Sequence, residues 1–352
     1  MIKILGLALY GSIAASHRVR LGQYRKGLLA KGIDLHIQSL LGNNYLQSRF
    51  QGGRRPFISV LNAGLERVQL LLSSRQFDAA IVHCELFPLV PGWLERAALR
   101  VPYIYDFDDA FYLRYQGGNL GALQILLGGK FDSVMRGAAA ITAGNTNLAA
   151  YAQALNENVT VLPSVVDTTH FSPGVRPDNP VFTVGWIGSP STAPYLQSLV
   201  APLHMLSRER ALRFVVIGGK APHIENVEVL EIPWSEESEI DLINTFDVGV
   251  MPLPNDEWAR GKCAFKLIQY MACGVPVVAS RVGANIDLVT PECGFLAETG
   301  EQWIGALRKL RDHPSMRIRM GESSRKRVMD AYSLERNLPL LANVIRKVVG
   351  KK

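Results

Sequence analysis

The stretch Gly261–Gly283 constrains the fold of this chain more than any other segment. Apolar side chains recur at helical spacing between Phe265 and Ala272. Gly274 follows at the position where helices commonly end in a left-handed residue. Residues 275–279 then form a short apolar run, which is typical of a parallel strand covered on both faces. The segment therefore predicts a helix, a tight stop and a buried strand in direct succession.

The polar residues of this segment place positive charge at the start of the predicted helix. Lys262, Lys266 and Gln269 are spaced i, i+4 and i+7, which predicts that they share one helix face. Lysines at a helix N-terminus oppose the helix dipole, at a cost of roughly 0.3–1 kcal/mol each. A bound anion removes this conflict, because the N–H groups and the lysines then point at the same negative group. A solvated lysine face is an equally good interpretation of the spacing alone.

The run GKCAFKLIQYMACGVPVVAS resembles the signature segment of family 4 retaining glycosyltransferases, which have the GT-B fold. Much of that family carries a Glu-x7-Glu motif here. By the resemblance, Gln269 stands at the second Glu, which holds the nucleotide ribose. Gly261 stands at the first Glu, which contacts the donor sugar. Lys266 matches a lysine found in part of the family, and this implies a contact with the donor diphosphate.

The resemblance implies an α/β fold of the GT-B type, with two doubly wound Rossmann-like domains facing across a cleft. Residues 1–165 would form the acceptor-side domain and residues 178–332 the nucleotide-sugar-binding domain. Residues 333–352 would form a helix that crosses back onto the first domain. Strands and helices alternate in both halves, which independently favours two similar α/β domains. Residues 163–180, rich in Pro, Asp and Gly, resemble the family's linker.

The implied activity is that of a hexosyl- or glycosyltransferase. It would move a sugar from a nucleotide-diphosphate donor, such as a UDP- or GDP-sugar, to a glycan or lipid-linked acceptor. The anomeric configuration would be retained, and neither a cofactor nor a metal is expected. Because Gly261 replaces the first Glu, a non-catalytic nucleotide-sugar-binding subunit of a glycan-assembly complex is an alternative, and a nucleotide-sugar epimerase is another. Walker, zinc-protease and serine-hydrolase motifs are absent from the sequence.

Further candidate binding residues lie in loops that follow predicted strands. Small residues let the backbone approach a phosphate, and hydroxyls can donate to it. By the resemblance, the loops after the first strand of each half and after residues 275–279 face the donor. Trp234 would contact the base or belong to the core, and Arg260 would assist the lysines. The loop residues are Gly11, Ser12, Gly188, Ser189, Thr192, Gly283, Ala284 and Asn285.

An acidic run follows the predicted strand at residues 102–106. Asp106-Phe107-Asp108-Asp109 suggests a metal at first sight, because hard cations take carboxylate oxygens. That motif, however, carries a metal in glycosyltransferases of the other major fold. By strand position, Asp108 stands where the GT-B family often has a His beside the transferred sugar. We therefore expect Asp108 and Lys266 to be the catalytic residues, whereas caps of the following turn are the alternative for the aspartates.

Two segments suggest a surface-binding role. Residues 43–75 interleave arginines, Arg67 among them, with apolar residues, which favours either a membrane or acceptor element or an ordinary excursion packed on the domain. Residues 112–129 predict either a second membrane-facing or acceptor element or simply part of the core. The net charge of +7 favours anionic partners, and no signature supports nucleic acid. The four cysteines form no Cys-x-x-Cys pair, as expected for a cytoplasmic protein, either free or peripheral at the inner membrane face.

Overall fold

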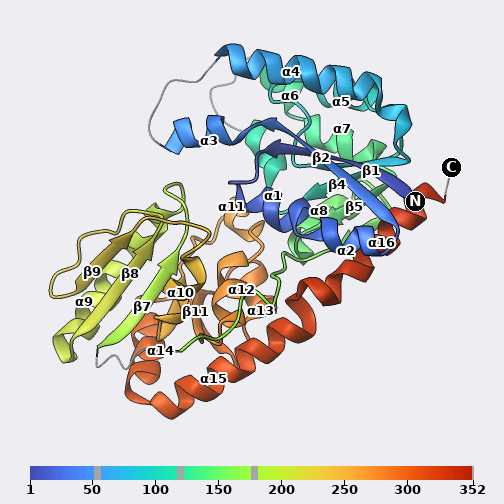
Figure 1. Cartoon of the computed structure of the whole chain (residues 1–352). Coiled ribbons are helices and arrows are strands. Elements are labelled where there is room, and N and C mark those ends of the chain that lie inside the picture. Colours follow the sequence, from blue (N-terminus) through green and yellow to red (C-terminus); the bar gives the residue numbers. More distant parts are fainter. Residues whose placement is uncertain (51–56, 117–122, 176–180, 351–352) are drawn as a thin grey trace. The chain divides into compact units, whose positions relative to one another are not determined.

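The chain folds into two compact units, drawn as a ribbon in Figure 1. The computed structural model describes residues 1–50, 57–116, 123–175 and 181–350. Unit 1 comprises Met1–Ser164, Gly261–Cys263 and Asn337–Lys352. Unit 2 comprises Val165–Arg260 and Ala264–Arg336. Residues 261–263, which the sequence analysis placed with the second half, therefore belong to unit 1.

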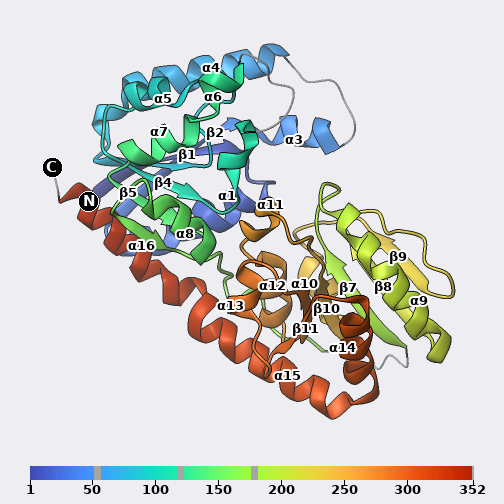
Figure 2. The same ribbon diagram turned by 180° about the vertical axis from the view of Figure 1, so that it is seen from behind.

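Unit 1 is built on a six-stranded parallel sheet in the order β2-β1-β3-β4-β5-β6. Its strands are β1 (Ile2–Tyr10), β2 (Ile33–Leu41), β3 (Ala79–His83), β4 (Tyr103–Phe107), β5 (Ala140–Ala143) and β6 (Val159–Val161). Its helices are α1 (Ala15–His17), α2 (Tyr24–Ala30), α3 (Asn43–Phe50), α4 (Phe57–Leu72), α5 (Gly92–Ala98), α6 (Leu123–Leu127), α7 (Lys130–Gly137) and α8 (Thr146–Gln153). Figures 1 and 2 show α4, α5 and α7 over one face of this sheet and α2 and α8 over the other. The apolar strands predicted from the sequence are thus covered on both sides.

Unit 2 repeats this plan with a second six-stranded parallel sheet, in the order β12-β11-β10-β7-β8-β9. Its strands are β7 (Phe182–Ile187), β8 (Leu212–Ile217), β9 (Glu228–Ile232), β10 (Val248–Met251), β11 (Val277–Ser280) and β12 (Gly294–Ala297). Its helices are α9 (Val200–Glu209), α10 (Glu239–Asn244), α11 (Glu257–Arg260), α12 (Phe265–Ala272), α13 (Ala284–Leu288), α14 (Gly300–Asp312) and α15 (Pro314–Arg327). The prediction of two doubly wound α/β domains is confirmed.

Strand β8 shows why the sheet of unit 2 needs helices on both faces. Phe214 and Val216 belong to one buried apolar cluster, together with residues of α9 and α14. Val215 and Ile217 belong to another, together with residues of α12. Because neighbouring side chains of a strand point to opposite faces, the apolar run 214–217 of β8 must be covered on both sides.

The last helix, α16 (Leu334–Val349), packs on unit 1 from Asn337 onward. A Cβ on Gly27 would lie 2.5 Å from a methyl carbon of Leu338, so this glycine allows α16 to approach α2. Arg346 donates a hydrogen bond to the carbonyl of Lys31 at 2.9 Å. Leu341 and Ile345 are buried beneath. Lys351 and Lys352 lie outside the described residues.

The basic segment 43–75 differs from its prediction at Arg67. This side chain is fully buried, and its guanidinium donates to the carbonyls of Ala8 (2.8 Å) and Gln38 (3.0 Å). Burial lowers the pKa of Arg67 to about 9. Arg67 therefore anchors α4 to the sheet and is not part of a basic surface. Residues 51–56 of the segment lie outside the described residues. No described helix is both long and apolar enough to cross a membrane.

A second buried charge network joins β3 to α5 and α7. Lys130 lies 2.6 Å from a carboxylate oxygen of Glu85 and 3.0 Å from one of Glu95. Glu85 also accepts hydrogen bonds from Arg114 at 2.8 Å and from the hydroxyl of Tyr115 at 2.6 Å. One buried ammonium thus serves two carboxylates. Burial outweighs its influence on Glu95 and raises the pKa of that carboxyl to about 7.

This raised pKa predicts a specific pH dependence of stability. Between about pH 4.5 and pH 7, folded Glu95 keeps a proton that the unfolded chain has released, so the free energy of unfolding falls as pH rises. Glu95→Gln cannot titrate, so wild type should lose up to roughly 1.4 kcal/mol per pH unit relative to this variant across that window. The difference should level off above it. Urea unfolding of both proteins from pH 5 to pH 8 measures this, and a pH-independent difference would contradict it.

Candidate functional site

Helix α12 is bounded at both ends by a residue with a left-handed backbone conformation. Ala264 precedes it with a left-handed φ of 55°, which is uncommon for a residue other than glycine. At the other end Gly274 has a φ of 70° and donates to the carbonyl of Met271, while Val275 donates to that of Tyr270. These two bonds are the Schellman motif that satisfies the last carbonyls of a helix. The helix end predicted at Gly274 is confirmed.

Tyr270 fixes α12 against the sheet of unit 2. Its hydroxyl accepts a hydrogen bond from the backbone N–H of Ile187, the last residue of β7, at 2.8 Å. Gly249 on β10 makes room for the ring, because a Cβ there would lie 2.2 Å from a ring carbon of Tyr270. The helix is thus held beside the carboxyl end of β7, where doubly wound sheets bind their ligands.

Lys266 lies on the first turn of α12 beside the loop that follows β7. Its ammonium is 5.4 Å from the ring centre of Trp186, and a Cβ on Gly188 would lie 2.8 Å from its Cε. The tighter contact of that Cβ would be with the Trp186 ring, at 2.3 Å, so glycine is needed at position 188 for the loop to lie against this ring. Ala264, at the N-cap, has no side-chain oxygen with which to cap the helix. A lysine beside an N-terminus without a side-chain cap is an arrangement that an anion stabilises.

The hydroxyl groups of the β7 loop are held by the loop itself. Thr192 donates from its hydroxyl to the carbonyl of Ser189 at 3.1 Å, and the hydroxyls of Ser189 and Ser191 lie 2.8 Å apart. The structure thus brings Gly188, Ser189 and Thr192 into one short turn next to Lys266.

Lys262 does not share the helix face of Lys266, so that prediction is wrong. The helix begins only at Phe265, and Lys262 belongs to unit 1, where its ammonium lies 3.1 Å from a carboxylate oxygen of Asp109. Asn145 holds this stretch by donating its side-chain amide to the carbonyls of Gly261 (2.9 Å) and Lys262 (3.0 Å). Burial raises the pKa of Asp109, although Lys262 opposes this shift.

Gly261 has no space for a side chain. A Cβ at this position would lie 2.6 Å from the Cβ of Ala110 and 2.7 Å from its backbone nitrogen. The contact gives a physical reason for the missing Glu of the family motif, because any larger residue would displace Ala110. Asp108 and Asp109, two carboxylate residues of unit 1, directly precede Ala110 in the sequence.

Gln269 is bound to a carboxylate that sequence reasoning missed. Glu239, at the start of α10, is 4% exposed and accepts hydrogen bonds from Gln269 (3.3 Å) and from the indole N–H of Trp234 (2.9 Å). The sequence does not distinguish Glu239 from its neighbours Glu236 and Glu237. Trp234, Glu239 and Gln269 form one connected group in unit 2.

The loop after β11 is tightly built. Gly283 has a φ of 54°, and a Cβ there would lie 2.7 Å from the carbonyl oxygen of Arg260. Asn285 is buried; its side chain donates to the carbonyl of Ser280 (2.9 Å) and its backbone N–H to that of Val282 (3.2 Å). Its amides therefore hold the loop, and the donor contact of Asn285 stays a prediction. Ala284 begins α13, and Arg260 donates to the side chain of Asn255 at 3.0 Å.

In unit 1, the side chain of Asn43 binds the loop after β1 through two hydrogen bonds. Its side chain donates to the hydroxyl of Ser12 at 3.0 Å and accepts from the N–H of Ile13 at 3.1 Å. A Cβ on Gly11 would lie 2.2 Å from the side-chain oxygen of Asn43, so only glycine fits. The sequence singled out Gly11 and Ser12 but not Asn43, which lies beyond the next strand.

Buried charges line the ends of β3 and β4. Asp106 pairs with Arg20 at 2.5 Å and 3.1 Å and with Nδ1 of His83 at 2.8 Å. Against the effect of burial, Arg20 and His83 hold the pKa of Asp106 well below its usual range. Arg20 comes from a π-helical turn at Arg18–Gly22, and its side chain is buried against Asp106. Asp108 is 16% exposed and lies 4.0 Å from Nε2 of His83.

Comparisons with known proteins agree with this geometry. Residues 181–313 match the family described as Glycosyl transferases group 1. A sucrose-phosphate synthase from Thermosynechococcus elongatus has the same fold over all of both chains, with a TM-score of 0.71 and 14% identity. Anabaena HepE, solved in complex with UDP-glucose, also matches over all of both chains, with a TM-score of 0.67 and 13% identity. The GT-B fold is therefore confirmed.

One curated relative matches over a short stretch. A probable sucrose-phosphate synthase from Thermosipho melanesiensis is 33% identical over 82 residues, which are 23% of this chain. The match spans about a fifth of that relative's length, at 19%.

Proposed function

We propose that the protein is a glycosyltransferase using a nucleotide-diphosphate-sugar donor, because residues 181–313 match the family of glycosyl transferases group 1 in a chain with the GT-B fold. The observation that carries the proposal is Lys266 beside Gly188 at the start of α12. Negative charge grows on the departing diphosphate in the transition state, and preorganised cations and N–H groups stabilise it there. Such a site needs no metal, and we propose transfer with retention.

The group formed by Trp234, Glu239 and Gln269 suits the nucleoside part of the donor. A carboxylate accepts hydrogen bonds from two ribose hydroxyls, which an amide does less well. Gln269 occupies the place of the family's ribose-binding Glu, and the buried carboxylate bound to it is that of Glu239. We assign the ribose to this pair and the base to Trp234. Gly188, Ser189 and Thr192 then take the phosphates.

Unit 1 supplies the groups that we assign to the transferred sugar and the acceptor. Asp108 keeps its proposed contact with the sugar, and Lys262, Gly11 and Ser12 stay in the proposed donor and acceptor set. Arg260, Gly283 and Ala284 stay in the donor set as parts of the loop after β11. A glycan or lipid-linked glycan is the acceptor that we propose.

Gly261 supports one alternative function, that of a subunit which binds a nucleotide sugar without catalysing its transfer. The tight contact with Ala110 leaves no space for the family's carboxylate. A panel of UDP- and GDP-sugars separates the candidates. Slow donor hydrolysis supports the transferase, binding without turnover supports the rival, and interconversion of free donor supports an epimerase.

Lys266→Met tests the diphosphate site. The variant removes the cation and keeps the stem that packs on Trp186, so transfer or donor hydrolysis should fall about 10²-fold while the fold persists. Lys309→Met is the matched control, because the Lys309 ammonium also stacks on an aromatic ring, 5.8 Å from the centre of Phe295. Initial rates and circular dichroism of both variants provide the measurement. A folded Lys266→Met variant with near-normal turnover would refute the assignment.

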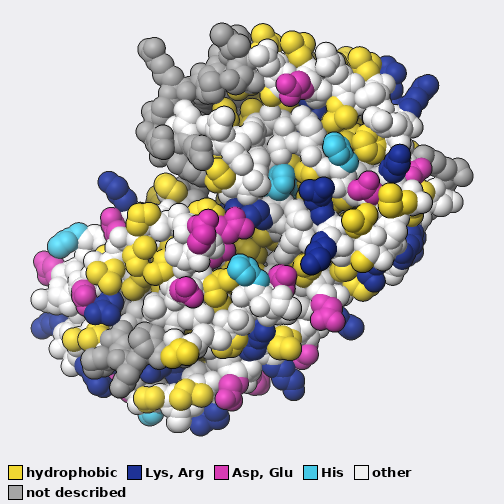
Figure 3. All heavy atoms as spheres, in the orientation of Figure 1, with side chains coloured by type: hydrophobic (Ala, Val, Ile, Leu, Met, Phe, Trp, Pro, Cys, Tyr) yellow, Lys and Arg dark blue, Asp and Glu magenta, His cyan; other side chains and the backbone are white. Residues whose placement is uncertain are grey.

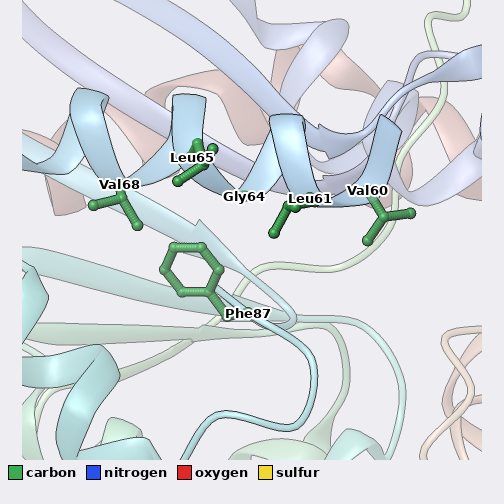
Figure 4. Close-up of a pocket in the computed structure, with 6 residues that line it drawn as sticks. All are labelled: Val60, Leu61, Gly64, Leu65, Val68 and Phe87. Carbon is green, nitrogen blue, oxygen red and sulfur yellow. The ribbon is translucent and has the colours of Figure 1, made fainter. Parts of the chain in front are cut away.

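An exposed apolar stripe on α4 favours a lipid surface as a partner of unit 1. Leu61, Leu65, Val68 and Leu72 recur at helical spacing and are each about half exposed, between 45% and 56%. Figure 3 shows hydrophobic side chains gathered over this helix, at the top of the view. In Figure 4, side chains of α4 point toward Phe87 and form an apolar groove with it.

Other exposed residues of unit 1 add apolar area and positive charge. Trp93 on α5 is 62% exposed and Leu89 58% exposed, while Arg75, Arg96 and Arg100 are exposed cations of the same unit. Exposed Leu and Trp beside arginines are typical of elements that lie on a membrane surface. Together with the net charge of +7, they favour an anionic lipid surface, which is where a lipid-linked acceptor would be found.

Replacing Leu61 and Leu65 together by Gln should lower binding to vesicles that contain an anionic lipid. The substitutions remove apolar area from the face without touching the buried side of α4. Met205 and Leu230 are exposed apolar residues of unit 2, so their double Gln variant is the matched control. Flotation with phosphatidylglycerol-containing and purely zwitterionic vesicles measures the effect. Equal flotation of all three proteins, or no preference for the anionic vesicles, would count against a membrane partner.

A further inference from the structure

Three potential metal ligands converge where β3 and β4 end in unit 1. The ligand atoms of His83, Cys84 and Asp108 all lie within 4.8 Å of one another. Nε2 of His83 is 3.0 Å from the sulfur of Cys84 and 4.0 Å from a carboxylate oxygen of Asp108. His83 and Cys84 are buried, whereas 16% of the Asp108 side chain is open to solvent. The cluster is therefore enclosed but accessible from one side.

The backbone of Cys84 is bent to build this cluster. Its φ is 65°, a left-handed conformation that is strained for a residue with a Cβ. The conformation is held because its N–H donates to the carbonyl of Asp106 (2.9 Å) and its carbonyl accepts from the hydroxyl of Tyr105 (2.8 Å). The bend brings the Cys84 thiol back onto the preceding His83, which an extended strand would prevent because successive side chains alternate.

The ring of His83 is oriented by Asp106. Arg20 keeps Asp106 ionised, so this carboxylate accepts the Nδ1–H of His83 at 2.8 Å. The lone pair of Nε2 then faces Cys84 and Asp108. Histidines that bind metals almost always donate their other N–H to such a partner, which fixes the tautomer and strengthens the ligand.

We propose that His83 Nε2, Cys84 Sγ and the Asp108 carboxylate bind a divalent transition metal of the Zn²⁺ class. Imidazole and thiolate are the ligands that Zn²⁺ selects, and three protein ligands leave a fourth tetrahedral position for water. With Zn–S near 2.3 Å and Zn–N near 2.0 Å, a tetrahedral ion separates its ligand atoms by roughly 3.5 Å. The separations of 3.0 and 4.0 Å bracket this value.

The charges balance when the ion binds. Burial, with help from Asp108 and Asp106, raises the pKa of the Cys84 thiol, so without an ion the sulfur keeps its proton. On binding, the S–H bond breaks, the proton leaves to solvent and the S–Zn bond forms, with no change of oxidation state. One thiolate and the Asp108 carboxylate then neutralise the two charges of the ion. Cys263 is not part of the set, because its thiol donates to the carbonyl of Asp108 at 3.1 Å.

The site would act against transfer, a consequence that rests on the proposed function. The ion takes the carboxylate of Asp108, which we assign to the transferred sugar, so bound metal and sugar contact exclude one another. Metal binding itself needs neither donor nor acceptor. The two proposals can therefore fail separately.

The test is a Co²⁺ titration of the full chain after treatment with a chelator. A thiolate ligand gives Co²⁺ a near-ultraviolet charge-transfer absorption, which should saturate at one ion per chain and disappear when Zn²⁺ is added. Cys84→Ser should abolish this absorption. Cys273→Ser, which removes a buried thiol of unit 2, should leave it unchanged. Absence of the absorption in the wild type, or its persistence in Cys84→Ser, would overturn the proposal.

Asp108→Asn provides a second variant should Cys84→Ser fail to fold, because its side chain is partly exposed. Loss of a charged ligand should weaken Co²⁺ binding at least tenfold while the charge-transfer absorption persists at saturation. An unchanged Co²⁺ affinity of the folded Asp108→Asn variant would remove Asp108 from the site and overturn the proposal.

Discussion

The positive end of α12 is the electrostatic constraint on which unit 2 depends. Its first turn combines the partial charge of the helix N-terminus with the ammonium of Lys266, and the N-cap residue Ala264 offers no side-chain oxygen. Tyr270 holds the helix against Ile187, and Gly188 lets the loop after β7 lie against the Trp186 ring beside the lysine. Several local features thus bring positive charge to one sheet edge. In the function proposed above, a diphosphate at that edge would remove this conflict, and its attraction to the site would grow as the leaving group departs.

Unit 1 carries its charges differently, because they are paired inside the protein. Arg20 with Asp106 and Lys130 with Glu85 are buried ion pairs, and Arg67 is satisfied by backbone carbonyls. Such pairs add little net stability, but removing one partner leaves an uncompensated buried charge at a cost of roughly 3–5 kcal/mol. Their clear effect here is orientation. Asp106 fixes the ring of His83, which in turn faces Cys84 and Asp108.

The sequence predicted the features that depend on local periodicity and on glycine. The strand–helix alternation of the two doubly wound domains and the stop at Gly274 follow from patterns a few residues long, whereas the return of the last helix to unit 1 was implied by the family resemblance. The prediction that Lys262 and Lys266 share a helix face was wrong. The helix begins only after the left-handed Ala264, and Asn145 binds the residues before it. Glu239, Asn43 and the pairing of Arg20 were missed for a related reason. Each is defined by a partner distant in the sequence, which no periodicity encodes.

The central claim is that the start of α12 binds the diphosphate of the donor, and calorimetric titration of the full chain tests it most directly. UDP and GDP are each compared with their nucleosides, uridine and guanosine, at low ionic strength. For whichever base the protein accepts, we expect the diphosphate to bind at least tenfold more tightly than the nucleoside, with the difference shrinking as salt is added. Equal affinities of nucleoside and nucleoside diphosphate would contradict the account.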